Sequence, residues 1–123
     1  VRNHVGLSVS PDRNPPYILM SDGSVRNSYT IKLRNMESRP REMEIAIDDL
    51  PGAVMWTDMG GRDAAARTQV KTVPADEVLT VRAYIVVPKG ASTQDFDFTV
   101  TSRDEQRESA AAEARFDAPG SGQ

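Results

Sequence analysis

The sequence predicts an all-β domain, an antiparallel β-sandwich of about seven to eight strands. Apolar and polar residues alternate with a period of two in several short runs, which buries one face of each strand and exposes the other. Residues that favour turns separate the runs at intervals of about ten residues, as in known sandwiches. A chain of 123 residues, 38% hydrophobic and 27% charged, is long enough for one globular core.

Three strands are expected within residues 1–48. Residues 5–9 alternate weakly, whereas residues 28–34 alternate strongly and place Tyr29 on the inward face. Residues 42–48 repeat the strong pattern. Residues that fix φ or tolerate positive φ predict turns beside these strands. The turn sites are Asp22-Gly23 and Leu50-Pro51-Gly52.

Four further strands are expected between residues 54 and 101. Residues 54–57 and 68–72 give weak signals, whereas residues 79–87 and 95–101 alternate strongly. Residues 63–67 could form one helical turn, which is too short to be stable alone. The predicted turn sites are Gly60-Gly61, Pro74-Ala75-Asp76 and Pro88-Lys89-Gly90.

The segment 108–116 is compatible with two structures. Its run of alanines has high helix propensity, yet alternate alanines lead to Phe116 in the pattern of a strand. A turn at 103–106 would pair this strand with residues 94–102, so we predict a strand and not a helix. We expect one sandwich over residues 1–118 and a flexible tail over residues 119–123.

Composition excludes several kinds of chemistry. The chain contains no cysteine, so it offers no disulfide, no thiolate and no cysteine ligand for zinc or iron–sulfur clusters. The net charge of -3 is mild, and basic residues are interspersed with carboxylates along the sequence. We therefore expect no nucleic acid partner and no cofactor in this domain.

The chain shows no apolar run of ~18 residues that would mark a membrane span. It starts at Val1 and not at a methionine. We therefore expect a piece of a longer polypeptide, in which any membrane attachment lies upstream of this domain.

No catalytic residues are predicted. A serine or threonine nucleophile normally needs a histidine partner, and the only histidine, His4, lies close to the N-terminus. The acidic pairs Asp48-Asp49 and Asp95/Asp97 are expected on the solvated surface, before a turn and on the polar face of a strand respectively. We therefore expect that this domain is not an enzyme.

Methionine is the residue type that suggests a metal, because thioethers favour copper(I). Met55 and Met59 flank a tryptophan, but on one strand they would lie ~13 Å apart, too far to share an ion. We expect core or loop packing for both. They remain the weak candidates for a copper site, with Met20 and His4 as possible further ligands.

One strand suggests an interaction surface. Tyr84 and Val86 fall on the polar face of the strand at 79–87. Two apolar side chains there mark either a docking face or a strand that is buried on both sides. The sequence favours neither alternative.

A second feature is the loop that contains Asp12, Arg13 and Asn14. The following Pro15-Pro16 fixes an extended backbone, and Arg13 and Asn14 can bond to neighbouring carbonyl and carboxylate groups. We expect this loop to fasten the structure and not to bind a ligand.

The same region carries a family resemblance that is dense from residue 9 to residue 52. The residues that carry it are Asp12, Arg13, Asn14, Pro15, Asp22, Gly23, Arg26, Asn27 and Tyr29, with Asn35 and Leu50-Pro51-Gly52. They resemble the C-terminal immunoglobulin-like domain of the FixG family. These proteins are also called cytochrome c oxidase accessory proteins and include the RdxA proteins.

The resemblance implies an immunoglobulin-like fold and a location on the periplasmic face of a bacterial inner membrane. It implies a parent protein whose membrane part carries iron–sulfur clusters and takes part in copper handling and oxidase assembly. The cysteines that would ligate those clusters are absent here. The resemblance therefore implies a non-catalytic interaction or stabilising domain, whose protein partner would be an oxidase subunit or a copper chaperone.

Two alternatives remain open. One is a periplasmic copper(I)-binding domain that uses methionine ligands. The other is an unrelated extracytoplasmic sandwich for adhesion or carbohydrate binding, although aromatic residues make up only 6% of the chain.

Overall fold

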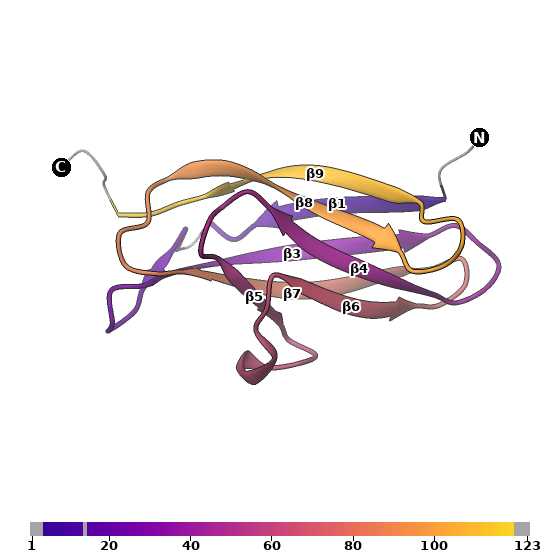
Figure 1. The fold of residues 1–123 in the computed structure, drawn as a ribbon, viewed down its shortest axis with the longest axis horizontal. Helices are drawn as coiled ribbons and strands as arrows, with labels where there is room; N and C mark the ends of the chain where they lie inside the picture. Colours follow the sequence, from indigo (N-terminus) through magenta and orange to yellow (C-terminus); the bar gives the residue numbers. More distant parts are fainter. Residues whose placement is uncertain (1–3, 14, 120–123) are drawn as a thin grey trace.

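The computed structural model describes residues 4–13 and 15–119 and folds them into two packed antiparallel sheets (Figure 1). No helix among these residues is long and apolar enough to cross a membrane. The elements are β1 (Val5–Pro11), β2 (Ile18–Leu19), β3 (Val25–Asn35), β4 (Arg41–Asp48), β5 (Val54–Thr57), the 3₁₀ helix η1 (Arg62–Ala64), β6 (Thr68–Val73), β7 (Val78–Val87), β8 (Gln94–Ser102) and β9 (Ser109–Phe116).

The two layers divide the strands in the manner of an immunoglobulin-like sandwich. Sheet A has the strand order β1-β3-β7-β5, with the short β2 beside β3, and sheet B has the order β6-β4-β8-β9. At one edge β1 lies against β9, and at the other an isolated bridge between Met55 and Ala66 joins the β5 edge to the segment before β6 (Figure 1). The predicted all-β sandwich is confirmed.

The core lies between the sheets and is built by the alternation that the sequence shows. In β3, every second residue from Val25 to Asn35 is buried. The ring of Tyr29 meets Phe98 edge-on, with ring centroids 5.2 Å apart, and Phe96 packs against both rings. Such edge-to-face contacts add to the stabilisation that burial of the rings provides.

The segment 108–116 is a strand, as predicted, and its alanines explain why. Ala112 pairs with Phe98 and Ala114 pairs with Phe96 across the β8–β9 ladder. The small alanine side chains on β9 leave room for the phenylalanine rings. This packing favours a strand and outweighs the high helix propensity of alanine.

The structure differs from the prediction most in two places. It contains nine strands among the described residues, because β2 is a two-residue strand with no alternation that a sequence could show. In addition, β3 begins at Val25, earlier than the predicted residue 28, because Val25 pairs with Val87 and with Leu19. Asn14 and all but the first residue of the expected tail at 119–123 lie outside the described residues.

Candidate functional site

Tyr84 and Val86, the predicted interaction residues, lie on the outer face of sheet A. The strand β7 runs between β3 and β5, so Tyr84 pairs with Ser28 on one side and Trp56 on the other. The rings of Tyr84 and Trp56 stack with centroids 5.6 Å apart and planes 27° apart. Tyr84 and Val86 are half-buried, as expected for a central strand whose outer face stays accessible.

Three arginines surround this pair of rings. The guanidinium carbon of Arg62 lies 5.2 Å from the centroid of Trp56, and those of Arg26 and Arg82 lie 5.7 and 5.9 Å from the centroid of Tyr84. These are cation–π distances. We call this set, Trp56, Tyr84, Arg26, Arg62 and Arg82, the aromatic–arginine patch.

The arginines of the patch differ in their partners. Arg82 is bound by Asp12, whose carboxylate accepts a hydrogen bond from Nη2 at 2.6 Å and thereby raises the pKa of Arg82. Within the described part of the chain, neither Arg26 nor Arg62 has a carboxylate within ion-pair distance, and Nε of Arg26 is buried without a hydrogen-bond partner. Two of the three positive charges are therefore available to an incoming group.

The loop is fastened through Asp12, a residue other than the two that the sequence suggests for this role. Its backbone N–H donates to the carbonyl of Ser28 at 3.0 Å, and its side chain binds Arg82 on the neighbouring β7. Arg13 and Pro15 are exposed, and Arg13 forms no hydrogen bond to any residue that the structure describes. The fastening thus comes from Asp12, whereas the predicted contribution of Asn14 lies outside the described residues.

Asp22 and Gly23 form the turn that leads into β3. The carboxylate of Asp22 accepts hydrogen bonds from the Ser24 hydroxyl at 2.6 Å and the Ser24 backbone N–H at 2.9 Å. These bonds lower the pKa of Asp22. Gly23 has φ of 90°, and a Cβ there would lie 3.0 Å from the side chain of Lys89, so conformation and space both favour glycine.

Asn27 and Tyr29 connect sheet A to the end of sheet B. The Asn27 amide exchanges two hydrogen bonds of 2.9 Å with the backbone of Asp117. The Tyr29 hydroxyl donates to the carbonyl of Arg115 at 2.7 Å, and burial raises its pKa. These residues of the resemblance are therefore structural in this fold.

The copper candidates are not brought together. Met55 is fully buried in the core, whereas Met59 lies beyond the end of β5 and is 56% exposed. Met20 lies in the turn before β3, and His4 lies before β1 beside two glutamates. Among the described residues, Met20, Met55 and Met59 therefore do not form a shared copper site.

Sequence reasoning missed a network of charges at the end of the sandwich where β1 starts. Nδ1 of His4 lies 3.1 Å from Glu37 and 3.2 Å from Glu108, and all three ligand-type atoms fall within 4.8 Å. The guanidinium of Arg41, whose side chain is 0% exposed, contacts Glu108 at 2.9 Å and Asp104 at 3.0 Å. His4 and Glu108 are 104 residues apart, so no local pattern could reveal the network.

The carboxylates of this network are held in their charged form. Burial alone would raise the pKa of Asp104, but hydrogen bonds from Arg41 and Arg39 outweigh it and hold that pKa well below its usual range. Burial would likewise raise the pKa of Glu108, but His4 and Arg41 lower it. The network joins the start of β1, the β3–β4 connection and the β8–β9 hairpin, so we interpret it as a clasp.

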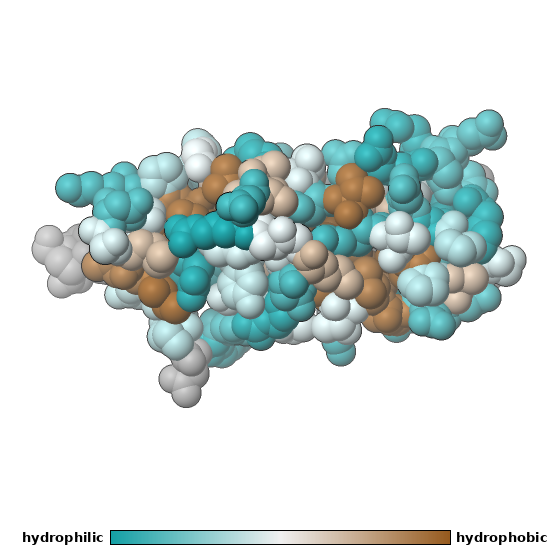
Figure 2. All heavy atoms as spheres, turned by 90° about the horizontal axis from the view of Figure 1, so that it is seen from below, coloured by the Kyte–Doolittle hydropathy of each residue, from teal (hydrophilic) through white to brown (hydrophobic). Residues whose placement is uncertain are grey.

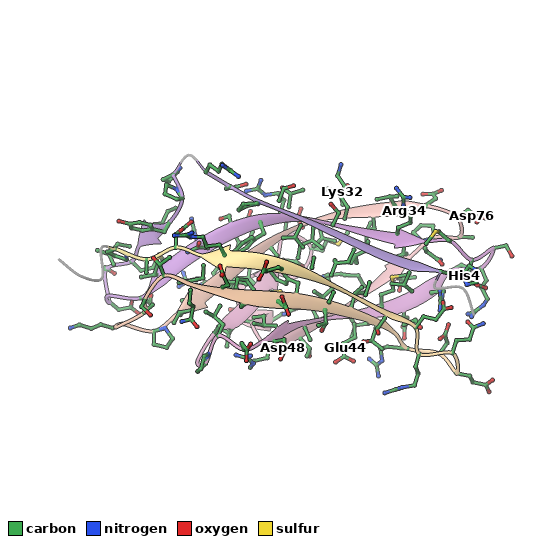
Figure 3. The ribbon with its side chains drawn as sticks, turned by 90° about the horizontal axis from the view of Figure 1, so that it is seen from above. His4, Lys32, Arg34, Glu44, Asp48 and Asp76 are labelled. Atoms are coloured by element: carbon green, nitrogen blue, oxygen red, sulfur yellow. The ribbon has the colours of Figure 1, made fainter. Side chains whose placement is uncertain are left out.

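The two outer faces of the sandwich carry opposite charge. The strands of sheet A contain no aspartate or glutamate, and their cations are Arg26, Lys32, Arg34 and Arg82. The outward face of sheet B also carries the cation Arg115, but it is net negative, because its outward carboxylates are Glu42, Glu44, Asp48, Asp95, Asp97 and Glu113. Figure 3 shows Lys32 and Arg34 on one side of the molecule and Glu44 and Asp48 on the other.

Apolar surface is scattered on the edge formed by β5 and β6. Figure 2, which looks onto the side where η1 lies in Figure 1, shows hydrophobic residues in separate groups among hydrophilic ones. The most distinctive surface is therefore the charged and aromatic face of sheet A.

Comparison with known proteins gives a consistent result. The family described as "IG-like fold at C-terminal of FixG, putative oxidoreductase" matches residues 1–119. Protein RdxB of Cereibacter sphaeroides is 35% identical over 99 residues, which are 80% of this chain and 20% of RdxB. Nitrogen fixation protein FixG of Rhizobium meliloti is 31% identical over 121 residues, 97% of this chain and 23% of FixG. The chain therefore spans about a fifth of the length of these curated relatives.

Solved structures share the fold. The crystal structure of a FixG-related protein from Vibrio parahaemolyticus superposes with a TM-score of 0.77 at 20% identity, covering 97% of this chain and 100% of that one. A structural genomics target, SoR45, superposes with a TM-score of 0.53 at 16% identity, covering 98% and 92%.

Proposed function

Because the chain belongs to the FixG family, as its C-terminal immunoglobulin-like domain, we propose that it is a non-catalytic docking module of a membrane-bound iron–sulfur accessory protein. In this proposal the domain stands on the periplasmic face of a bacterial inner membrane. There it contacts a protein partner, an oxidase subunit or a copper chaperone, and supports copper handling and oxidase assembly.

The aromatic–arginine patch is the observation that carries the proposal. Residues that dominate protein interfaces are most often tryptophan, tyrosine and arginine, because they combine large rigid area with directional bonds. Here Trp56 and Tyr84 are already stacked, and Arg62 and Arg26 lie over their rings without a carboxylate partner among the described residues. Because Trp56 is only 8% exposed, a partner would meet Tyr84 and the arginines, which the buried indole holds in place, so little side-chain entropy would be lost on binding.

The geometry of the polar groups supports a non-catalytic role. A general base needs to lie within hydrogen-bond reach of the group that it deprotonates. The chain's single histidine directs Nδ1 at Glu37 and Glu108. Among the described residues no serine or threonine hydroxyl is hydrogen-bonded to it.

The two alternative functions receive no support from this geometry. Met55 and Met59 do not converge, and Trp56 is only 8% exposed beneath Arg62, so its ring face is not free to stack on a sugar. Family membership also argues against an unrelated adhesion sandwich.

The proposal is tested in the full-length protein in its host. We expect the double variant Arg62→Glu/Tyr84→Ala to lower the capture of a cross-linked membrane partner by at least about tenfold, a loss typical of interface hot spots. Oxidase assembly should fall to the level seen when the domain is deleted. The control is Arg103→Glu, an exposed cation in the β8–β9 connection, which should leave both unchanged.

Two results would contradict the proposal. One is normal capture and normal assembly in a double variant that is folded and fully expressed. The other is normal assembly after deletion of the whole domain.

A further inference from the structure

The end of sheet A where β1 starts and β3 ends contains a surface hollow. It has a volume of about 330 Å³ and lies where β1, β3 and β7 run side by side. Its main lining residues are Lys32, Arg34, Met36, Val78, Gly6 and Ser8. Figure 3 shows Lys32 and Arg34 projecting from this side of the molecule.

The floor of the hollow depends on a glycine. Gly6 of β1 pairs with Arg34 of β3, and a Cβ at Gly6 would lie 3.2 Å from Cβ of Arg34 and 3.7 Å from its Cδ. The absence of a side chain at this position lets Arg34 lie across β1. Ser8 pairs with Lys32 two residues further on, so both cations stand over small side chains.

The cations of the hollow are not held in ion pairs. In the part of the chain that the structure describes, neither Lys32 nor Arg34 forms an ion pair. Asp76 and Glu77 line an adjacent hollow with Arg34 but stay beyond ion-pair distance. Two apolar side chains stand beside the cations, Met36 at 42% and Val78 at 44% exposure.

The pairing of free cations with exposed apolar side chains indicates the ligand. Lysine is depleted in protein interfaces, which argues against a protein at this end of the face. Nucleic acid would require stacking aromatics, and none lines the hollow. Long cationic side chains beside apolar ones suit an interface where phosphate groups lie next to hydrocarbon.

We propose that this end of sheet A docks on an anionic phospholipid surface, with Lys32 and Arg34 binding headgroup phosphates and Met36 and Val78 lying beside them. The carboxylates of sheet B face the opposite way and are repelled by the same surface, so the domain would lie with sheet A toward the lipid. This inference uses residues outside the aromatic–arginine patch, which lies next to them on the same face, because Lys32 follows Thr30, the ladder partner of Arg82, by two residues.

The test measures co-sedimentation of the 123-residue chain with vesicles at low salt. Vesicles of phosphatidylglycerol mixed with phosphatidylcholine should bind the chain, and vesicles of phosphatidylcholine alone should not. Each cation near an anionic bilayer contributes about fivefold to the partition coefficient, so Lys32→Glu/Arg34→Glu should lower it by at least about 25-fold. Asp76→Asn/Glu77→Gln should increase binding, because it removes nearby negative charge.

The matched control is Arg103→Glu/Arg107→Glu. It reverses two exposed cations that line a hollow at the sheet B side and gives the same net charge as the first variant. Retained binding in this control together with lost binding in Lys32→Glu/Arg34→Glu supports the proposal.

Several results would overturn it. They are equal binding to neutral vesicles, equal loss in both double variants, and displacement from vesicles by inorganic phosphate, which would indicate a free-phosphate site. Binding of single-stranded DNA that is lost in the same variant would assign the hollow to nucleic acid. Because the aromatic–arginine patch stays intact in these variants, loss of vesicle binding can be separated from loss of the protein partner.

Discussion

Asn27 and Asp117 exchange two hydrogen bonds of 2.9 Å, with the side-chain amide of Asn27 taking the place of a backbone partner. The amide thereby satisfies both backbone groups of Asp117 immediately after β9 ends. Because Asn27 belongs to sheet A and β9 belongs to sheet B, this pair joins the two layers at the end where the chain leaves the fold.

Replacement of Asn27 by alanine should destabilise the domain. Both backbone groups of Asp117 would lose their partner, and unsatisfied groups of this kind cost about 1–3 kcal/mol each. We expect the free energy of unfolding in urea to fall by about 2–3 kcal/mol. Ser28→Ala, one residue along β3 and facing outward, should change it by less than about 0.5 kcal/mol. Equal effects at both sites would contradict the assigned role of the pair.

The small residues of β9 give a second prediction. Ala114 pairs with Phe96 and packs against the core, whereas Ala111 is exposed on the outer side of sheet B. Ala114→Leu should overpack this contact and cost about 1–3 kcal/mol. Ala111→Leu should stay within about 0.5 kcal/mol of the parent. Thermal unfolding of the two variants measures the difference, and similar losses in both would mean that β9 is not packed as described.

The clasp at the start of β1 predicts sensitivity to acid. The pKa of Asp104 lies below its ordinary value of 3.8, and that of Glu108 lies below 4.5. A depressed folded-state pKa contributes stability above the unfolded-state value and loses it as pH falls through the folded-state value. The free energy of unfolding should therefore decrease as pH drops below about 4.5.

Asp104→Asn provides the check on this pH dependence. Its unfolding free energy should fall less steeply with acid than that of the parent, because one of the linked protonations has been removed. Asp95→Asn, on the outer face of sheet B, is the control and should leave the slope unchanged. A parent slope that persists in Asp104→Asn would show that this carboxylate does not carry the effect.

Arg62 gives a prediction that uses the single tryptophan as a reporter. Its guanidinium covers Trp56, which is only 8% exposed. Arg62→Ala should make Trp56 fluorescence more susceptible to quenching by acrylamide, and it should lower the free energy of unfolding by no more than about 1 kcal/mol, since a surface cation–π contact is worth about 0.5–1 kcal/mol. Arg103→Ala should not alter quenching. Unchanged quenching in Arg62→Ala would mean that the arginine does not cover the ring.

The strands were largely predictable because apolar and polar residues alternate along them and so show which side chains are buried. Alternation in β3, β4, β7 and β8 reports directly which side chains enter the core. The choice of strand for β9 followed from the spacing of Ala112 and Ala114, which match Phe98 and Phe96. By contrast, β2 has two exposed residues and no period to read.

The charged features were not predictable for a different reason. Lys32 and Arg34 lie within ten or so residues of Glu42 and Glu44 in the sequence, so the charges look mixed. They separate in space because β3 and β4 belong to different sheets. The clasp depends on contacts between His4 and Glu108, which only the folded chain brings together. The local sequence pattern predicts on which face of its strand a residue lies, whereas the topology determines which strands lie next to one another.

Segregation of charge between the two layers makes the domain an electric dipole whose direction runs through the thickness of the sandwich. A net charge of -3 conceals this arrangement, because opposite charges cancel in the sum but not in space. The isoelectric point is therefore a poor guide to chromatographic behaviour. A cation-exchange resin would bind the positive face of sheet A, and an anion-exchange resin would bind the negative face of sheet B. Near any charged boundary, such a molecule experiences a torque as well as a force.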